Sequence, residues 1–280
     1  MTSPRRITPP MPTTTQEWVL IVTWLGLTLL ALFGPSLVQP GDPHGFADQQ
    51  LWLGIPHALD VLTNLPFAAF GLAGLVVLVP LIRKANTAIT QVNIAGAAIF
   101  FIGLLATAAG SAYYHWAPDD ASLAVDRLGM VVAFAGLLAL AVADRVSTRA
   151  ARWTAPVLLV AGAMSVWAWS VSGNVLAWAV VQFGGMGVLL WLMRLQPLPG
   201  ALSIRWGWVL ALYAVAKGLE LADHQVHEFT AGWVSGHNLK HVVASLAAWP
   251  VLHALHNAGR DVRQYARLRT TNSLVTAIKR

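Results

Sequence analysis

The sequence GSAYYHWAPDDASLAVD, residues 110–126, joins the end of one apolar segment to the start of the next. It carries Ser111, His115 and Asp126. Because Ser111 and His115 are four residues apart, they lie on the same face of a helix, one turn from each other. Ionisable groups are costly between segments that belong in lipid, so their presence here predicts a functional site in a membrane protein.

A second polar stretch lies far away in the sequence, at GHNLKH, residues 236–241. His237 and His241 repeat the four-residue spacing. Lys240 is next to His241 but is expected to point away from it on a helix and to reach outward. A pair of histidines four residues apart is not specific by itself, whereas its combination with the Ser111–His115 pair and a following Asp predicts one shared site.

The composition is that of a polytopic membrane protein. Of 280 residues, 56% are hydrophobic and 11% are charged, whereas a soluble domain has about 25% charged residues. The net charge is +6, but the basic residues lie in short loops between apolar runs, so no nucleic-acid partner is expected. There is no cysteine, so a metal ion would need His and carboxylate ligands, which suits zinc.

Hydropathy predicts eight transmembrane spans, each near the roughly 20 residues that cross the hydrocarbon. The first, 17–38, is too long for a signal-peptide core and is followed by no small-residue cleavage site, so it is expected to be retained. The other seven form a core over 58–257. Their expected bounds are 58–82, 92–114, 122–143, 153–171, 175–193, 206–222 and 236–255. The predicted fold class is therefore all-α integral membrane, a seven-helix core with one additional N-terminal helix.

Three further segments complete the expected organisation. Residues 1–16 are predicted to be a disordered polar tail, and residues 258–280 a basic cytoplasmic tail. Residues 39–57 form an outer loop. Its second half, 46–56, mixes apolar and polar side chains, which is typical of a segment lying at the membrane interface.

The loop charges alternate along the chain and predict its orientation. Loops at 39–57, 115–121, 172–174 and 223–235 contain no Lys or Arg. The basic residues all fall on the other side of an eight-span arrangement: Arg5, Arg6, Arg83, Lys84, Arg145, Arg149, Arg152, Arg194, Arg205 and the tail from Arg260 to Arg280. By the positive-inside rule both termini are cytoplasmic, and the His-containing span ends lie toward the outer leaflet.

Three imidazoles, those of His115, His237 and His241, can form a zinc site with an open fourth position for water. Asp126 would take the proton as zinc lowers the pKa of that water toward ~7. Ser111 would donate to the developing oxyanion or hold the water. The alternative for each single His is an interfacial hydrogen-bonding residue without a metal.

Other polar residues have a structural interpretation beside the functional one. Lys217 and Glu220, three residues apart in the seventh span, are expected to pair with each other, or Glu220 with Arg127. His224 and His227 are expected to be solvated loop residues, although they are close enough to line an entrance to the site. Their role stays open at this point.

Asp60, Thr63 and Asn64 enter the second span as polar groups on one side. Asn64 is expected to hydrogen-bond a backbone group, as polar residues between membrane helices commonly do, or to hold a catalytic side chain. Pro66, Pro80 and Pro250 are expected to kink their spans. Gly110 is expected to permit the close approach of a second helix.

These motifs resemble those of the alkaline ceramidases: SAYYH, the Asp eleven residues after its His, and HNLKH. That family belongs to the CREST superfamily of seven-span metal-dependent hydrolases, which also includes the progestin/adipoQ receptors. Bacterial ceramidase-like membrane proteins look closer still. The similar segments are FADQQLWLGIPHALDVLTNLPF (46–67), SAYYHWAPDDASLAVDRLGM (111–130) and VSGHNLKHVVASLAAW (234–249). The resemblance covers about residues 46–257 and leaves the first span outside.

The resemblance implies a zinc ion held by His115, His237 and His241, a water activated by Asp126, and an oxyanion stabilised by Ser111. The implied reaction is hydrolysis of the amide of a ceramide or related membrane lipid, giving a sphingoid base and a fatty acid. The implied location is the bacterial inner membrane, with the active site toward the periplasmic leaflet.

One departure from the family pattern bears on a second metal. Position 57 is His where the ceramidases have the Glu that accompanies calcium, and no acidic run precedes it, so calcium is not expected. Two other functions remain open. One is a receptor-like or non-catalytic lipid-binding protein with a structural metal site. The other is a transporter in which Lys217, Glu220 and Asp126 form a proton path. Because fold does not determine function, the substrate assignment depends on the resemblance alone.

Overall fold

A computed structural model describes residues 14–39, 41–83 and 90–260. Within these ranges every regular element is a helix, and the only β-pairing consists of two isolated bridges. The prediction of an all-α fold is therefore confirmed. Most of the predicted tails, 1–16 and 258–280, lies outside the described residues, as do the predicted loop residues Arg5, Arg6 and Lys84.

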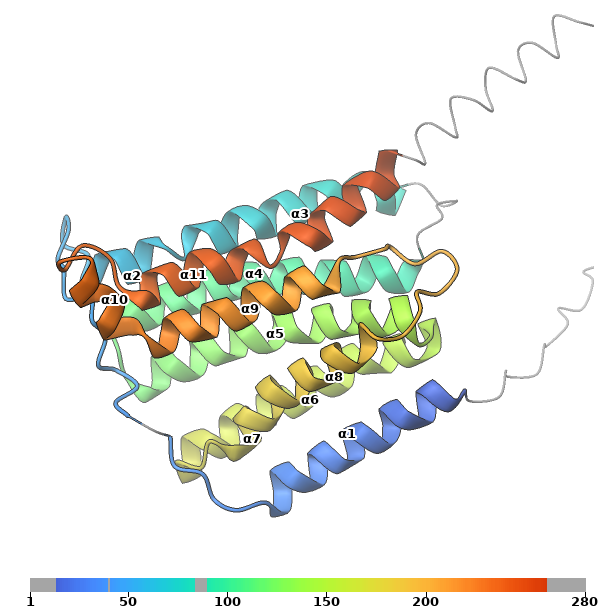
Figure 1. The fold of residues 1–280 in the computed structure, drawn as a ribbon, viewed down its shortest axis with the longest axis horizontal. Helices are drawn as coiled ribbons and strands as arrows, with labels where there is room; N and C mark the ends of the chain where they lie inside the picture. Colours follow the sequence, from blue (N-terminus) through green and yellow to red (C-terminus); the bar gives the residue numbers. More distant parts are fainter. Residues whose placement is uncertain (1–13, 40, 84–89, 261–280) are drawn as a thin grey trace, which may run out of the picture.

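The helices form an elongated bundle whose long elements run back and forth between two ends (Figure 1). Their bounds are α1 (Thr15–Phe33), α2 (Ala58–Leu62), α3 (Leu65–Arg83), α4 (Gln91–Trp116), α5 (Asp120–Arg145), α6 (Thr148–Ser172), α7 (Leu176–Ala179), the π-helix η1 (Val180–Gly184), α8 (Gly185–Leu192), α9 (Trp206–Leu221), α10 (Asp223–Phe229) and α11 (Gly236–Leu246). Beyond a turn at 247–248, residues 249–260 are again helical.

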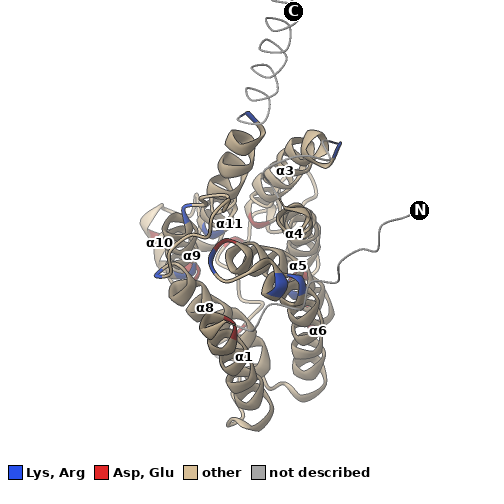
Figure 2. Cartoon of the chain, turned by 90° about the vertical axis from the view of Figure 1, so that its right-hand side faces the viewer, with Lys and Arg blue, Asp and Glu red and all other residues tan. Residues whose placement is uncertain are grey.

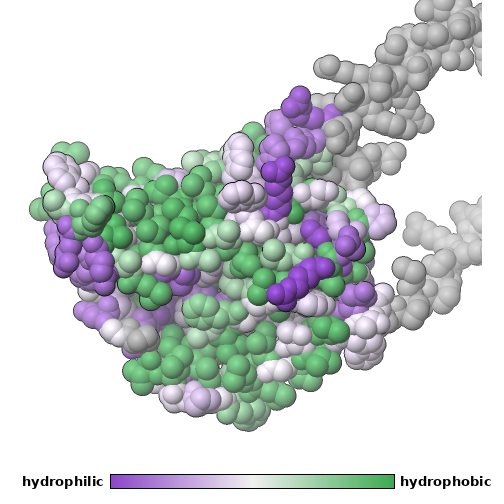
Figure 3. Space-filling view, in the orientation of Figure 1, coloured by the Kyte–Doolittle hydropathy of each residue, from purple (hydrophilic) through white to green (hydrophobic). Residues whose placement is uncertain are grey.

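Five helical segments are long and apolar enough to cross a membrane. They are Thr15–Phe33, Ala58–Arg83, Gln91–Trp116, Asp120–Arg145 and Thr148–Ser172. A shorter apolar stretch, Leu176–Leu192, comprises α7, η1 and α8. Apolar residues cover much of the visible face between the two ends (Figure 3). The length and apolar composition of these helices indicate an integral membrane protein.

Helices α4 and α5 approach closely enough for their backbones to touch. A Cβ atom at Gly103 would lie 2.2 Å from the Ala133 nitrogen, and one at Gly110 would lie 2.9 Å from the Val125 oxygen. The close approach expected at Gly110 is thus confirmed. Small residues of this kind let membrane helices pack tightly, and here they hold the two halves of 110–126 side by side.

The last span bends where the sequence contains Pro250. Helix α11 ends at Leu246, and the chain resumes a helical conformation only at residue 249. A proline inside a helix removes one backbone donor and its ring collides with the carbonyl four residues earlier. The predicted kink at Pro250 is confirmed. Pro66 lies at the start of α3, just after the turn at 63–64, whereas Pro80 lies inside the continuous helix α3.

One end of the bundle is basic. Arg83 and Arg145 lie in the last turns of α3 and α5, at the end where α1 begins and the last described helix finishes (Figure 1). Figure 2 looks onto this end and shows several Lys and Arg residues around it. The three histidines discussed below lie toward the opposite end, where α4 finishes and α11 begins.

Two buried carboxylates at the basic end have hydrogen-bond or ion-pair partners on other elements of the fold. Asp144 accepts hydrogen bonds from the Leu202 backbone nitrogen at 3.0 Å and from Trp206 Nε1 at 3.3 Å. Glu17 is 3% exposed and forms an ion pair with Arg149, which ties α1 to α6. Both groups act as structural connections between elements.

Candidate metal centre

The structure brings three histidines together from two helices that are distant in sequence. His115 lies in the last turn of α4, and His237 and His241 lie in the first turns of α11. One ring nitrogen from each lies within 4.8 Å of the others. His115 and His241 are 1% and 2% exposed. The predicted meeting of the two stretches is confirmed, and this group, the three-histidine centre, could hold a metal ion.

The position of α11 is determined by contacts at its first residues. A Cβ atom at Gly236 would lie 2.2 Å from the Leu219 oxygen, so only glycine allows this approach to α9. The Asp223 carboxylate then accepts hydrogen bonds from the backbone nitrogen of His237 at 2.8 Å and from the backbone nitrogen of Ala47 at 3.0 Å. A negative charge at this position also suits the positive end of the helix.

The ring of His241 is oriented by Thr63. The Thr63 hydroxyl donates to the Leu59 oxygen at 2.6 Å and lies 3.0 Å from His241 Nδ1. Since a hydroxyl has one proton, Thr63 must accept from Nδ1–H. This assigns the His241 proton to Nδ1 and leaves Nε2 free as a ligand atom. Fixing a ligand tautomer in this way is the usual role of a residue behind a metal-binding histidine.

The ring of His115 faces the carboxylate of Asp60. Its Nδ1 lies 3.9 Å from Asp60 Oδ2, and neither atom has a hydrogen-bond partner among the described residues. The other oxygen, Oδ1, accepts from Asn238 Nδ2 at 2.6 Å. A carboxylate beside Nδ1 leaves Nε2 for a metal ion and makes the ring a better ligand. The two unpartnered atoms and the donor set therefore fit a divalent metal ion.

The role of Asp60 beside His115 was not predicted from the sequence. Asp60 and Thr63 were expected only as polar groups on one side of the span. Each instead lies behind a different ring of the three-histidine centre. The short helix that carries them is capped by the buried Asp48, whose Oδ2 accepts from the Leu59 nitrogen at 2.9 Å. The signal in the sequence was the three-residue spacing of two polar groups inside an apolar span.

Lys240 turns inward, so the prediction that it reaches outward is wrong. Its Nζ lies 2.6 Å from His237 Nε2 and 3.3 Å from Glu220 Oε1. Residues three apart share a helix face, and Glu220 supplies a negative charge inside the bundle. Glu220 also pairs with Lys217, as predicted. A divalent ion on His237 Nε2 would repel the ammonium, for which Glu220 is the nearby partner.

Phe46 covers the three-histidine centre from the outer loop. Its ring centroid lies 4.4 Å from that of His115 and 5.4 Å from that of His237. Phe46 is 6% exposed, so its ring packs inside the protein. Leu51 and Trp52, from the same predicted segment, are exposed. At this position the aromatic ring buries its apolar surface against the imidazoles.

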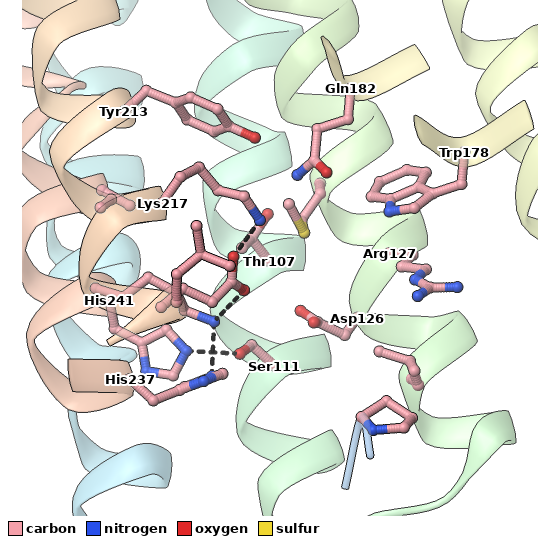
Figure 4. Close-up of a pocket in the computed structure, with 18 of the residues that line it drawn as sticks. Thr107, Ser111, Asp126, Arg127, Trp178, Gln182, Tyr213, Lys217, His237 and His241 are labelled. Carbon is pink, nitrogen blue, oxygen red and sulfur yellow. Dashed lines mark hydrogen bonds and ion pairs between the residues drawn. The ribbon is translucent and has the colours of Figure 1, made fainter. Parts of the chain in front are cut away.

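A cavity of about 1050 Å³ adjoins the three-histidine centre. Ser111, Asp126, His237 and His241 line one part of it. Ser111 Oγ lies 3.4 Å from His241 Nε2, and the Asp126 carboxylate points toward Ser111 (Figure 4). Most residues further into the bundle are apolar, among them Phe100, Leu104, Leu137, Met186, Val209 and Ala248. The cavity thus combines a polar wall at the histidines with a mostly apolar interior, as ligand sites commonly do.

The two other histidines near this end lie on a short helix. His224 and His227 were predicted to be solvated loop residues. The prediction of a loop is wrong, because both residues belong to the helix α10. His224 lines the cavity, and its Nε2 lies 3.1 Å from the Gly45 oxygen. His224 therefore lies beside the cavity, in agreement with the alternative prediction that it lines an entrance to the site.

The residues predicted for the site, His115, His237, His241, Asp126 and Ser111, all lie at the three-histidine centre or along the cavity. Their resemblance to ceramidase motifs is an interpretation of the sequence that the geometry neither requires nor opposes. The structural basis for a function is the three-histidine centre, the carboxylate behind one of its rings and the cavity beside it. In comparisons with known proteins, no family model and no curated protein matches the chain.

Proposed function

We propose that the chain is a zinc-dependent intramembrane hydrolase of lipid amides, of the ceramidase type. It would cleave the N-acyl bond of a ceramide or related lipid to a sphingoid base or amine and a fatty acid. The observation that carries the proposal is the convergence of the three-histidine centre with Asp126 and Ser111 on one cavity with an apolar interior.

His115, His237 and His241 would hold the zinc ion as neutral imidazoles, a ligand type that zinc favours. When bound, zinc supplies Lewis acidity and lowers the pKa of a water from 15.7 to about 7. Thr63 and Asp60 hold two of the three rings with Nε2 free. The donor set contains no thiolate, because the chain has no cysteine.

Asp126 and Ser111 would carry out the proton transfer and the charge stabilisation. The Asp126 carboxylate would accept the proton of the attacking water and return it to the nitrogen of the leaving amine. The Ser111 hydroxyl would donate to the amide oxygen as negative charge develops there. Phe46 would limit the access of bulk water, which strengthens both interactions.

The apolar part of the cavity would accommodate a lipid chain. A chain that moves from the bilayer into this cavity exchanges one apolar surrounding for another, so little hydrophobic free energy is gained. Binding would therefore be selective only where the lipid meets polar groups. The amide at the three-histidine centre is one such point.

The proposed membrane arrangement has eight spans, the last three being Leu176–Leu192, α9 and the bent helix that begins with α11. Both termini would be cytoplasmic, and the three-histidine centre would lie toward the periplasmic leaflet of a bacterial inner membrane. The support is that Arg83 and Arg145 lie at the end of the bundle opposite to the three histidines. The positive-inside rule assigns that end to the cytoplasm.

The test combines metal analysis of the purified protein with a screen of lipid amides for hydrolysis. Zinc bound in proportion to protein, together with release of fatty acid, would support the proposal. Tight lipid binding without turnover would instead favour a receptor-like protein. Proton-coupled uptake into vesicles that persists after metal removal would favour a transporter.

A further inference from the structure

A buried arginine, Arg127 of α5, lies in the wall of the cavity next to the proposed reacting groups. It belongs to the candidate membrane span Asp120–Arg145, is 6% exposed and lines the cavity beside Asp126. In Figure 4 the Asp126 carboxylate lies between Ser111 and Arg127, so Arg127 is on the side of Asp126 away from the histidines. Because a charged side chain inside a membrane span is costly, its presence points to a function.

The guanidinium group of Arg127 packs against two buried indole rings. Its Cζ atom lies 3.9 Å from the ring centroid of Trp169 in α6 and 5.6 Å from that of Trp178 in α7. Its Nη2 donates to Gln39 Oε1 of the outer loop at 2.7 Å. Contacts from three separate elements hold the group in one orientation. A planar guanidinium that stacks on aromatic rings in this way keeps its remaining donors aligned for an acceptor.

No ion pair neutralises the charge of Arg127. None of the ion pairs within 4.0 Å among the described residues includes it. Asp126 attracts it from a longer distance, and its carboxylate points toward Ser111. Glu220, the carboxylate that the sequence offered as a partner, is paired with Lys217 and Lys240 instead.

One donor group of Arg127 is also free. Nη1 is buried and has no hydrogen-bond partner within the described part of the chain. A buried charged group without full compensation is expensive, and buried polar groups are almost always hydrogen-bonded. A free donor on a buried cation in a cavity wall therefore indicates that a ligand supplies the acceptor.

Arg127 lies at the polar end of the cavity, at the outer loop. Gln39 of that loop lines the cavity and contacts Arg127. Further along α5 the lining residues are apolar and include Met130, Phe134 and Leu137. Leu137 follows Arg127 by ten residues, which is about 15 Å along the helix axis at a rise of 1.5 Å per residue. A lipid with its amide at Ser111 and its chain along this apolar wall would direct its head group toward Arg127.

We infer that Arg127, with the rings of Trp169 and Trp178, binds an oxyanion on the head group of the lipid. The oxyanion is a carboxylate or a phosphate on the amine part of the molecule, and a ceramide has neither. The inference rests on the proposed function for the position of the amide. Arginine suits both acceptors, because its donors match the oxygens of carboxylate and phosphate and its charge is permanent. A hydrogen bond from Nη1 to the oxyanion would satisfy the free donor and compensate the charge.

Three ethers with the same alkyl chain test this binding without hydrolysis, since they contain no amide. They are 2-(tetradecyloxy)ethyl phosphate, 3-(tetradecyloxy)propanoate and the neutral 2-(tetradecyloxy)ethanol. Equilibrium dialysis would use the purified protein in a maltoside detergent, whose surface has no charge. We expect at least one anion to bind about tenfold more tightly than the alcohol, as a hydrogen bond to a charged group predicts. The tighter anion identifies carboxylate or phosphate, and equal affinity for all three would overturn the inference.

Inorganic phosphate distinguishes a lipid head group from a free anion. An excess of inorganic phosphate should leave the preference for the anionic ether unchanged, because only the lipid also fills the apolar part of the cavity. Loss of the preference in its presence would show a site for free anions and contradict the assignment to a head group.

Two variants assign the preference to Arg127. Arg127→Met removes the charge and the donors, and Arg127→Gln removes the charge but keeps a donor for Gln39. In either variant we expect the anion preference to fall to about one, with the affinity for the alcohol within about twofold of the wild type. Arg152→Met, at an exposed arginine of α6, is the matched control and should keep the preference. A folded variant of Arg127 with the wild-type preference, or equal losses for all three ethers, would contradict the inference.

Hydrolysis assays separate this inference from the proposed function. The matched amides are N-myristoyl ethanolamine, its phosphate ester and N-myristoyl-β-alanine. An anion preference that depends on Arg127, without turnover of any amide, would support the oxyanion site and contradict the hydrolase. Turnover of the amides with no anion preference among the ethers would support the hydrolase and overturn the oxyanion site.

Discussion

Asp60 and Asp144 are both buried carboxylates, but they lie at opposite ends of the bundle and have different surroundings. Asp144 has both oxygens hydrogen-bonded, one by Leu202 and one by Trp206. Asp60 has one oxygen bonded to Asn238, while the other lies unpartnered 3.9 Å from an unpartnered nitrogen of His115, among the residues that the structure describes. Full hydrogen bonding is typical of a structural carboxylate, whereas incomplete bonding in a buried site requires a separate explanation.

The explanation that fits Asp60 is a metal ion on the far side of the imidazole. A cation at Nε2 polarises the ring, which strengthens the attraction between Nδ1–H and the carboxylate. Asp144 needs no such ion because backbone and indole donors already surround it. The comparison therefore separates the end of the bundle with the candidate metal centre from the end whose buried carboxylates connect helices. The variants below test that separation.

The largest effect is expected from His237→Ala. Removing one of three ligands leaves too few donors for a catalytic zinc site, so bound zinc and lipid amide hydrolysis should both be lost. Metal content by mass spectrometry and fatty-acid release are the measurements. His253→Ala, an exposed histidine of the last helix, is the control. A purified His237→Ala protein with full zinc and full turnover would remove the site assignment.

Asp126→Asn should retain the metal and lose most of the rate. The amide cannot accept a proton from the attacking water, and loss of a general base costs about 10²–10⁴-fold in kcat. Steady-state kinetics together with metal analysis measure both properties. Asp120→Asn, an exposed acid in the first turn of α5, should leave both unchanged. Unchanged kcat in Asp126→Asn would exclude Asp126 as the base.

Asp60→Asn and Asp144→Asn test the comparison directly. Asp60→Asn should weaken zinc affinity by about 10- to 100-fold, as other changes behind metal-binding histidines do. Asp144→Asn should leave zinc affinity unchanged and lower the free energy of unfolding by about 1–3 kcal/mol, because it replaces an accepting oxygen by a donor. Competition with a chelator and thermal unfolding in detergent measure the two. If both variants changed zinc affinity and the free energy of unfolding in the same way, the two ends of the bundle would not differ in function.

The smallest effect is expected from Glu17→Gln. It removes the charge that pairs with Arg149 and holds α1 against α6. Because Arg149 is partly exposed, with 43% of its side chain accessible, solvent weakens the pair and the loss should be about 1 kcal/mol or less. Thermal unfolding measures it. A fall in zinc content would show that the basic end also supports the three-histidine centre.

Several features were predictable from the sequence because they depend on spacing along one chain. Composition and hydropathy predicted helices of a membrane protein, and the four-residue spacings predicted which side chains share a helix face. Pro250 predicted a kink and Gly110 a close helix contact for equally local reasons. The ligand candidates followed from the rarity of ionisable groups in apolar segments.

Other features depend on how one helix is rotated and positioned against another, and only the tertiary structure decided them. The backbone contacts at Gly110 and Gly236 set the depth at which α4 and α11 meet α5 and α9. From that depth follow the position of Asp60 behind His115 and the inward turn of Lys240. The spacing of residues along the sequence determines which side chains share one face of a helix. The packing of that helix against other segments determines which residues the face contacts.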